Sequence, residues 1–296
     1  MDVGFIGIGQ MGKYMANHIL EAGHNLTVHD LRKEAAVPLI EKGAKWFDTP
    51  EEVAASTQVV LTSLPTPQSV EEVVYGKHSL REGWKEGDIY VDMSTNSPSL
   101  IRTIAEDAMA MGVAVLDAPV SGGTKRAEAG TLTIMVGGDV NYLNIVQEIL
   151  VTMAQNIFPV GDVGCGNIAK LVNNMIALAC NSISAEGFAL GVKAGINPKV
   201  LWDIVTTSTG NNWCVQQYPN TTFKGNFEPG FRVDLAYKDI GLALALGEEN
   251  GVPLPVGIAV QQDLHDTMMA GFSDKGVDAV ILPLESVTGV AVRAPE

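Results

Sequence analysis

The stretch Val3-Gly4-Phe5-Ile6-Gly7-Ile8-Gly9-Gln10-Met11-Gly12 decides the fold of this chain. Its apolar run, Val3–Ile8, predicts a buried strand, and the pattern of Met11–Glu21 predicts a helix directly after it. The Gly7-x-Gly9-x-x-Gly12 spacing permits a tight turn, the close approach of a ligand to the backbone, and close packing of helix on strand. The stretch therefore predicts a strand–turn–helix unit with a phosphate site where the helix begins. Because glycine-rich turns after a strand are common, the motif alone leaves the ligand open.

Outward from this stretch, residues 3–159 alternate short apolar runs with longer amphipathic segments. Such alternation is typical of βαβ units that cover a parallel sheet. The strands that we expect are Val3–Ile8, Leu26–His29, Val59–Ser63, Ile89–Asp92, Ala114–Ala118 and Leu132–Val136. We therefore expect an α/β domain over residues 1–162.

The pattern of apolar residues changes after residues 161–166, and no segment after them has the pattern of a strand. Ile168–Lys193 contains no proline and is apolar on nearly every side, which predicts a buried helix. Its polar interruptions, such as Lys170 and Asn181, favour a core helix over a membrane span. Further helices are expected at Pro198–Thr207, Leu235–Asn250 and Val256–Ala270, and loops at 208–222 and 230–233. We expect an all-α domain over residues 163–296.

The composition narrows the class of partner. Lys and Arg number 19 against 34 Asp and Glu, so the formal net charge of the 296-residue chain is −15. Such a surface repels phosphate backbones and anionic headgroups, which predicts no nucleic acid and no membrane as partner. Three cysteines without a C-x-x-C pair and five histidines without ligand spacing predict no metal site. With no targeting segment at the N-terminus, a reducing cytoplasm fits best.

Asp30 ends the second expected strand, about 20 residues after the glycine turn. A carboxylate there can accept hydrogen bonds from the ribose hydroxyls of an adenosine, and it would repel a 2′-phosphate. NAD is therefore favoured over NADP, although Arg32 can partly compensate and keeps NADP open. The alternative is that Asp30 is a solvated loop acid.

Two further clusters carry candidate chemistry. Asp117–Thr124 ends a strand, and Ser121, Gly122 and Gly123 offer donors to an anion such as a carboxylate. A tight turn that needs glycine for its dihedral angles explains this segment equally well.

Lys170 and Asn174 lie four apart, hence on one helix face, in a segment otherwise built for burial. A buried lysine can exchange a proton with a substrate hydroxyl that the amide holds in place. A lysine that snorkels to solvent is the alternative, and Asn173 competes for the amide role. Lys238-Asp239, near a helix start, reads by default as a solvated face.

Taken together, these stretches resemble the β-hydroxyacid dehydrogenase family, relatives of 3-hydroxyisobutyrate dehydrogenase and, more remotely, of 6-phosphogluconate dehydrogenase. The resemblance runs nearly end to end. Its four signatures are the cofactor signature Phe5–Gly12, the substrate signature Asp117–Thr124, the catalytic signature Gly164–Asn174, and the second cofactor signature Lys238–Ala243. Four motifs in this order are far more specific than one.

The resemblance implies a Rossmann-type domain followed by an all-α domain, joined by a long helix, with the active site in the cleft between them. It implies a homodimer or homotetramer. It makes Lys170 the general acid/base, Asn174 the group that orients the substrate, and Ser121, Gly122 and Gly123 the carboxylate site, with Phe231 and Asp239 closing it. The implied cofactor residues are Gly7, Gly9, Gln10, Met11, Gly12, Asp30, Arg32, Leu64, Pro65, Thr95 and Lys238.

The implied reaction is a hydride transfer between NAD, with NADP possible, and a small 3-hydroxy carboxylate. Residues 118–136 and 242–255 resemble 2-(hydroxymethyl)glutarate dehydrogenases, whereas 218–238 resemble sulfolactaldehyde reductases. A sulfolactaldehyde or semialdehyde reductase, or a catalytically silent dinucleotide-binding module, are the alternatives. Imine reductases share the architecture but replace the lysine, so Lys170 speaks against that branch. Arg232 or Lys224 are candidates for reading a second carboxylate.

Overall fold

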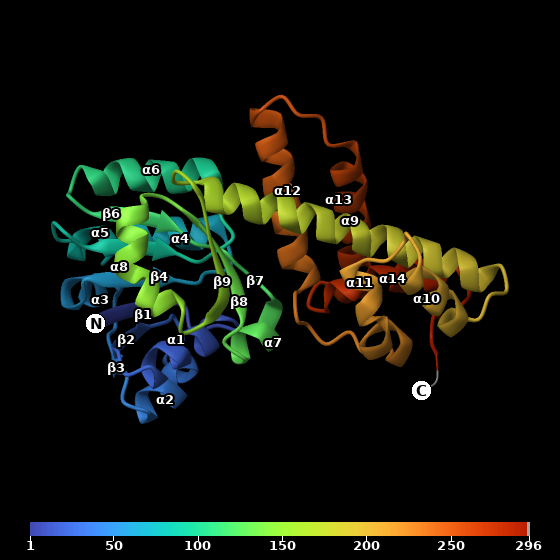
Figure 1. Cartoon of the computed structure of the whole chain (residues 1–296), viewed down its shortest axis with the longest axis horizontal. Helices are drawn as coiled ribbons and strands as arrows, with labels where there is room; N and C mark the ends of the chain where they lie inside the picture. Colours follow the sequence, from blue (N-terminus) through green and yellow to red (C-terminus); the bar gives the residue numbers. More distant parts are fainter. Residues whose placement is uncertain (295–296) are drawn as a thin grey trace. The chain divides into compact units, whose positions relative to one another are not determined.

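Helices and strands alternate through the first part of the chain, as the sequence predicts (Figure 1). The strands are β1 (Asp2–Ile6), β2 (Asn25–His29), β3 (Lys45–Trp46), β4 (Val59–Thr62), β5 (Ile89–Asp92), β6 (Ala114–Asp117), β7 (Val120–Ser121), β8 (Leu132–Gly137) and β9 (Ala154–Gly161). The helices are α1 (Gly12–Glu21), α2 (Lys33–Glu41), α3 (Pro50–Ser56), α4 (Pro67–Tyr75), α5 (Leu80–Gly83), α6 (Pro98–Met109), α7 (Gly123–Glu128) and α8 (Val140–Leu150). The structure, a computed structural model, describes residues 1–294, so the last two residues of the expected all-α range lie outside the described part.

All the strands form one sheet with the order β3-β2-β1-β4-β5-β6-β8-β7, and β9 pairs with β8. From β3 to β6 the neighbours are parallel, and the order reverses between β1 and β4. Ligands of such doubly wound sheets bind beyond the carboxyl ends of the strands at this reversal. The glycine turn that follows β1 lies at that point, because Gly7 N donates to His29 O and Ser63 N donates to Ile6 O.

The sheet is not parallel throughout, which corrects the sequence-based expectation. β8 runs antiparallel to β6 and to the two-residue strand β7. The chain turns back directly after β6, and the helix in this connection, α7, is too short to form a crossover to a parallel neighbour. The apolar run of β8 predicted a strand, but a run carries no information on the strand's direction.

Helices cover both faces of the sheet in this first part. One apolar cluster joins β1 and β2 to α1, α2 and α8 through residues such as Phe5 and Met15, which are fully buried. A second joins β4 and β5 to α3–α6 through residues such as Val60 and Ile101. Burying one such side chain contributes about 1.5–3 kcal/mol, so the two clusters stabilise the sheet that carries the site.

The chain divides into two compact units, Met1–Lys170 and Leu171–Glu296, called units 1 and 2 below. The division falls inside helix α9 (Cys165–Lys193). Unit 2 continues with α10 (Pro198–Thr207), α11 (Trp213–Gln217), α12 (Val233–Glu249), α13 (Pro255–Thr267) and α14 (Ile281–Thr288). Its described residues pair as β-structure only at the isolated bridge between Arg232 and Gly276, so the expectation of an all-α second part is confirmed.

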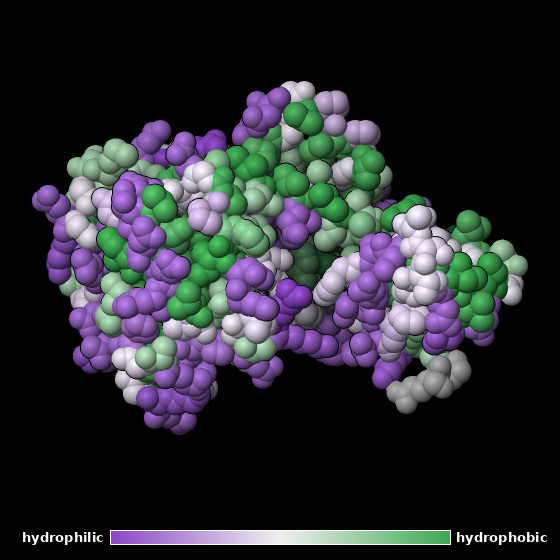
Figure 2. Space-filling view, in the orientation of Figure 1, coloured by the Kyte–Doolittle hydropathy of each residue, from purple (hydrophilic) through white to green (hydrophobic). Residues whose placement is uncertain are grey.

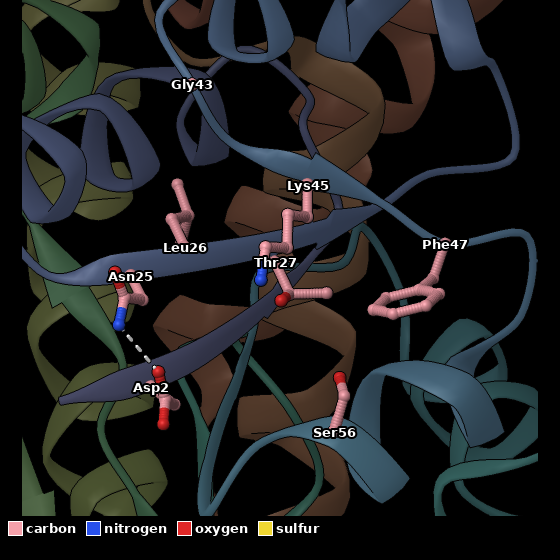
Figure 3. Close-up of a pocket in the computed structure, with 8 residues that line it drawn as sticks. All are labelled: Asp2, Asn25, Leu26, Thr27, Gly43, Lys45, Phe47 and Ser56. Atoms are coloured by element: carbon pink, nitrogen blue, oxygen red, sulfur yellow. Dashed lines mark hydrogen bonds between the residues drawn. The ribbon is translucent and has the colours of Figure 1, made fainter.

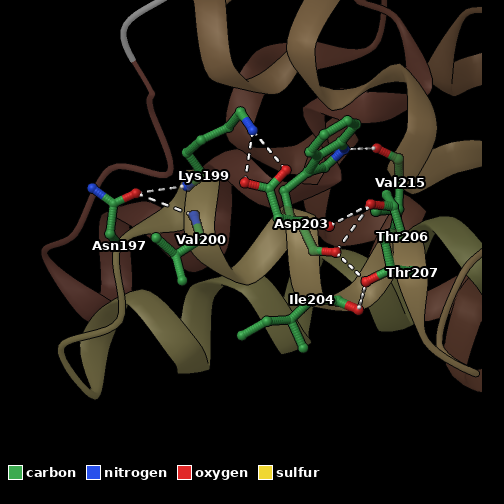
Figure 4. Close-up of polar contacts among 9 residues, drawn as sticks. Asn197, Lys199, Val200, Asp203, Ile204, Thr206, Thr207 and Val215 are labelled. Carbon is green, nitrogen blue, oxygen red and sulfur yellow. Dashed lines mark hydrogen bonds and ion pairs between the residues drawn. The ribbon is translucent and has the colours of Figure 1, made fainter.

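Cap residues decide the local boundaries in unit 2. Asn197 accepts hydrogen bonds from the amides of Lys199 and Val200 and so begins α10, and Lys199 forms an ion pair with Asp203 one turn on (Figure 4). The expected loop 208–222 was wrong in part, because Asn212 caps the short helix α11 within it. Similarly, α12 begins at Val233, which places Lys238-Asp239 in its second turn rather than at its start.

Helix α9 is long and apolar enough to cross a membrane by length and composition alone. Its buried Asn181 donates to the carbonyl of Val277 in unit 2, which is the behaviour of a core helix in a folded unit. The sequence predicted a helix that is buried on nearly every side, and this prediction is wrong for one face of α9. Ile176, Ile183 and Leu190 are 57%, 62% and 71% exposed and form an apolar stripe. Figure 2 shows apolar side chains at the surface over α9 and α10.

One carboxyl in unit 2 makes stability depend on pH. Burial raises the pKa of Asp278 to about 6, above the ordinary value of 3.8. Because the folded state holds this proton more tightly, the contribution of Asp278 to the free energy of unfolding falls as pH rises from about 4 to 6 and stays low above that. We expect Asp278→Asn to remove this cost. In denaturant unfolding, the variant should be more stable than wild type by about 3 kcal/mol at pH 7.5 and by about 1 kcal/mol at pH 4.5. An advantage that does not change with pH would contradict this.

Candidate active site

The glycine turn between β1 and α1 contains glycines of two kinds. Gly7 has a φ of +95°, and a Cβ at Gly12 would lie 1.9 Å from the carbonyl oxygen of Gly7. The fold itself therefore requires both. At Gly9 the φ is ordinary, and a Cβ would meet no heavy atom of the described residues within 4 Å. Neither the backbone conformation nor the packing of the described residues requires glycine at this position, which leaves room for the pyrophosphate of a dinucleotide.

Asp30 lies at the end of β2 beside this turn. Its carboxylate accepts a hydrogen bond from the amide of Ile8 and another from the amide of Arg32, both at 2.8 Å. It is half-buried and tied to the glycine turn, unlike a freely solvated loop acid. The side chain of Arg32 is exposed. A carboxylate held between the ends of β1 and β2 suits the ribose hydroxyls of a bound adenosine.

The other expected cofactor residues of unit 1 follow neighbouring strands. Leu64 and Pro65 come after β4, and Thr95 comes after β5, so all lie at the carboxyl edge of the sheet. The amide of Leu64 donates to the hydroxyl of Ser94 at 2.9 Å. Gln10 is exposed and Met11 half-buried at the start of α1. Lys238 belongs to unit 2, where its ammonium lies 2.9 Å from Asp239 Oδ1.

Ser121, Gly122 and Gly123 form the turn between β7 and α7. Gly122 and Gly123 have φ values of +135° and +66°, so the backbone needs glycine here whatever binds. A Cβ at Gly122 would also lie 2.7 Å from the side chain of Arg126. The turn explanation thus accounts for the glycines, and the half-buried Ser121 is the residue that it leaves unexplained.

Asp117, the last residue of β6, caps the amino end of α9, a role that the sequence analysis did not predict. Its buried carboxylate accepts from the amide of Gly164 at 2.8 Å and from that of Asn167 at 2.7 Å. Burial raises the pKa of Asp117, and these amide donors oppose that shift. A Cβ at Gly166 would lie 2.4 Å from the carbonyl of Asp117, which explains that glycine. An aspartate at a strand end, paired with Gly-x-Gly before a long helix, is the signal that could have found this cap.

Lys170 and Asn174 lie one turn apart on α9 and are 9% and 7% exposed. That burial argues against a lysine that snorkels to solvent. Asn174 Nδ2 donates to Asp239 Oδ2 at 2.6 Å, so Asn174, Asp239 and Lys238 form one polar cluster in unit 2. Asn173 is exposed and donates to Asn174 Oδ1, so it is Asn174 that faces Asp239.

The remaining candidates divide. Phe231 is half-buried against the apolar core of unit 2. Arg232 forms a bidentate ion pair with Asp234, which already neutralises the charge proposed to bind a second carboxylate.

Away from these residues, Glu51, His78 and Glu82 bring three possible metal-ligand atoms within 4.8 Å of one another. His78 Nδ1 there pairs with Glu51 at 3.0 Å, and we assign no metal to this largely exposed group.

A shallow pocket of about 100 Å³ lies elsewhere on the sheet (Figure 3). It is lined by Asp2 and Asn25, the first residues of β1 and β2, which share a hydrogen bond of 2.8 Å. Asp2 and Asn25 lie at the amino ends of the strands, whereas the glycine turn and Asp30 lie at the carboxyl ends. The pocket is therefore not the candidate site.

Comparison with known proteins identifies the family. The family model described as the NAD binding domain of 6-phosphogluconate dehydrogenase matches residues 2–161. The model described as NAD-binding of NADP-dependent 3-hydroxyisobutyrate dehydrogenase matches residues 164–284. Together the two models cover both units.

Individual relatives match over nearly the whole chain. A 2-(hydroxymethyl)glutarate dehydrogenase of Eubacterium barkeri is 39% identical over 99% of this chain and 97% of its own length. A 3-sulfolactaldehyde reductase of Escherichia coli is 30% identical over 98% of both chains. The solved structure of a Mycobacterium tuberculosis 3-hydroxyisobutyrate dehydrogenase with L-serine is 33% identical, with a TM-score of 0.88 over 96% of this chain and 98% of that one. By sequence and by fold, the chain belongs to the β-hydroxyacid dehydrogenase family.

Proposed function

We propose that this protein transfers a hydride between NAD and a small 3-hydroxy carboxylate, with Lys170 as the general acid/base. The observation that carries the proposal is the pairing of a buried Lys170 with Asn174 one turn later on α9. The open space at Gly9 and the fixed carboxylate of Asp30 support a dinucleotide as the partner. The named activities of the relatives support a hydroxy acid as the substrate.

The roles of the residues follow from their chemistry. The bound nicotinamide supplies the hydride acceptor or donor. Ser121 and the turn amides of Gly122 and Gly123 would bind the substrate carboxylate, and Asn174 would orient the hydroxyl. During oxidation Lys170 Nζ accepts the hydroxyl proton, and during reduction it returns that proton to the carbonyl oxygen. Asp239 holds the amide of Asn174 in place through its 2.6 Å hydrogen bond.

The substrate itself is tested by a panel. Relatives are named for 2-(hydroxymethyl)glutarate, 3-hydroxyisobutyrate, L-serine and 3-sulfolactaldehyde. We would follow nicotinamide absorbance with the first three and with 2,3-dihydroxypropanesulfonate, the alcohol that corresponds to 3-sulfolactaldehyde. We expect turnover of a carboxylate, because Ser121 and the turn amides suit its two oxygens. Preference for the sulfonate would contradict the carboxylate assignment, and tight cofactor binding with no turnover at all would contradict the proposed activity.

Cofactor preference provides a separate prediction at Asp30. We expect Asp30→Asn to raise the ratio of kcat/KM with NADP to that with NAD by about tenfold or more, because the carboxylate no longer repels the 2′-phosphate. Asparagine keeps an acceptor for the amide of Ile8 or Arg32, so the fold should survive. Asp2→Asn, on the same sheet but at its amino edge, is the matched control and should leave the ratio unchanged. An unchanged ratio in Asp30→Asn would remove the basis for preferring NAD.

We further propose that the protein is a cytoplasmic homodimer or homotetramer. The apolar stripe of α9 and the exposed Val200 and Ile204 of α10 support self-association, since such surfaces are commonly covered by a partner. The three cysteines are free, which suits a reducing compartment. Light scattering checks the assembly, and a monomeric mass at micromolar concentration would contradict it.

A further inference from the structure

A chain of buried polar side chains begins at the carboxyl end of β5. Asp92 is fully buried, and its Oδ1 accepts from the hydroxyl of Thr62 at 2.9 Å and from the amide of Ser94 at 3.1 Å. Its Oδ2 accepts from Asn96 Nδ2 at 3.0 Å. Asp92 thereby fixes the loop that follows β5 to the end of β4.

Asn167 continues this chain into the first turn of α9. Its side-chain oxygen accepts from the amide of Asn96 at 2.7 Å, and its Nδ2 donates to Asp117 Oδ2 at 3.2 Å. The side chain is fully buried. Asn167 therefore joins the loop after β5 to the helix that carries Lys170.

The two ends of this chain lie at residues with proposed roles. At one end, Ser94 accepts from the amide of Leu64, and Thr95 lies between Ser94 and Asn96. At the other end, Lys170 follows Asn167 by one helical turn. All of these residues belong to unit 1.

The side chain of Asn167 is not required to begin α9. Asp117 already accepts from the backbone amides of Gly164 and Asn167, which is the usual way to satisfy a helix start. The amide side chain does something additional, since it accepts from one neighbour and donates to another. An aspartate here would place a second carboxylate against Asp117, and a leucine would leave the buried partners of Asn167 unpaired.

We propose that Asn167 is a positioning residue, which holds Lys170 in place relative to the loops that carry Leu64 and Thr95. The proposal rests on the function proposed above for Lys170. A lysine displaced by about 1 Å from the reacting hydroxyl can lose about two orders of magnitude in rate, so a rigid link between its helix and the cofactor loops has a catalytic consequence.

The test is Asn167→Ala, with Asn181→Ala as the matched control. Asn181 is also a buried asparagine of α9, but its amide donates to the carbonyl of Val277 in unit 2. Asn167→Ala removes two buried side-chain hydrogen bonds of α9 and Asn181→Ala removes one, so both variants should have a lower melting temperature. We expect only Asn167→Ala to lower kcat, by about 10- to 100-fold, with little change in the KM for NAD. The assay uses NAD and the best substrate of the panel above.

A second readout needs neither substrate nor cofactor. Protein labelled with 13C at the lysine ε-carbons gives a signal for Lys170, which Lys170→Arg identifies. We expect this signal to shift or broaden in Asn167→Ala and to stay in place in Asn181→Ala. If Asn167→Ala does not fold, Asn167→Ser, which keeps one polar group, replaces it in both measurements.

The outcomes distinguish the positioning role of Asn167 from the proposed role of Lys170 as the general acid/base. If Lys170→Ala abolishes turnover while Asn167→Ala has wild-type kcat and an unmoved Lys170 signal, the proposed function stands and the positioning role is wrong. Equal losses of kcat in Asn167→Ala and Asn181→Ala would indicate a merely structural role and would also overturn it. If Lys170→Ala is fully active, the proposed role of Lys170 is wrong, and the positioning role of Asn167, which rests on it, is wrong as well.

Discussion

Lys170→Ala is expected to lower kcat by about two to four orders of magnitude while NAD still binds. The loss follows because alanine has no group that can take the hydroxyl proton during oxidation or return it during reduction, the two steps proposed for Lys170. Binding survives because the turn of Gly7, Gly9 and Gly12 and the carboxylate of Asp30 do not involve Lys170. Steady-state kinetics and NADH fluorescence titration measure the two quantities separately.

Two variants sharpen this experiment. Lys170→Arg keeps the positive charge, but a guanidinium does not give up its proton in a protein, so its kcat should stay low. Lys193→Ala changes another lysine of α9, whose exposed side chain donates to the carbonyl of Thr288, and should leave kcat at the wild-type value. Full turnover in Lys170→Ala would remove the lysine from the mechanism.

Gly9→Ala and Gly12→Ala are expected to fail in opposite ways. At Gly9 a Cβ enters open space in the described structure, so Gly9→Ala should melt like wild type and yet lose NAD affinity by more than about tenfold. At Gly12 a Cβ would lie 1.9 Å from the carbonyl of Gly7, so the turn must deform. Overpacking of this kind costs about 1–3 kcal/mol or more, and the melting temperature should fall.

The contrast between the two glycines is the informative result. Thermal melting with and without NAD, together with a fluorescence titration, distinguishes a glycine that the fold requires from one that the ligand requires. If Gly9→Ala binds NAD normally, the pyrophosphate does not pass over this turn. The cofactor would then have to bind elsewhere on unit 1.

Local patterns were sufficient for much of the architecture. The strand Ile89–Asp92 and the helix Pro198–Thr207 lie where the sequence pattern predicted them, because the burial of apolar side chains follows their spacing along the chain. The carboxyl-edge placement of Gly7 and Asp30 also follows from order along the chain, since each comes directly after a strand of a parallel sheet.

Other features needed the folded chain. The strands β3 and β7 are two residues long, and β9 is half-exposed, so none presents an apolar run. The exposed stripe of α9 has the same apolar composition as its buried faces, and only packing separates the two. The folded chain also decided that Asp117 accepts from the backbone amide of Asn167 and that Asp239 accepts from the side-chain amide of Asn174.

By itself, the sequence determined the family, the dinucleotide turn and the candidate residues Lys170 and Asn174, because these depend on residue types at short spacing. The tertiary structure alone decided that Asp117 caps α9, that Asn174 rather than Asn173 meets Asp239, and that Asn167 joins Asn96 to Asp117. These contacts join residues that are 50 to 71 positions apart. No local pattern encodes a hydrogen bond across such a separation, since it exists only after the sheet has brought the strand ends together.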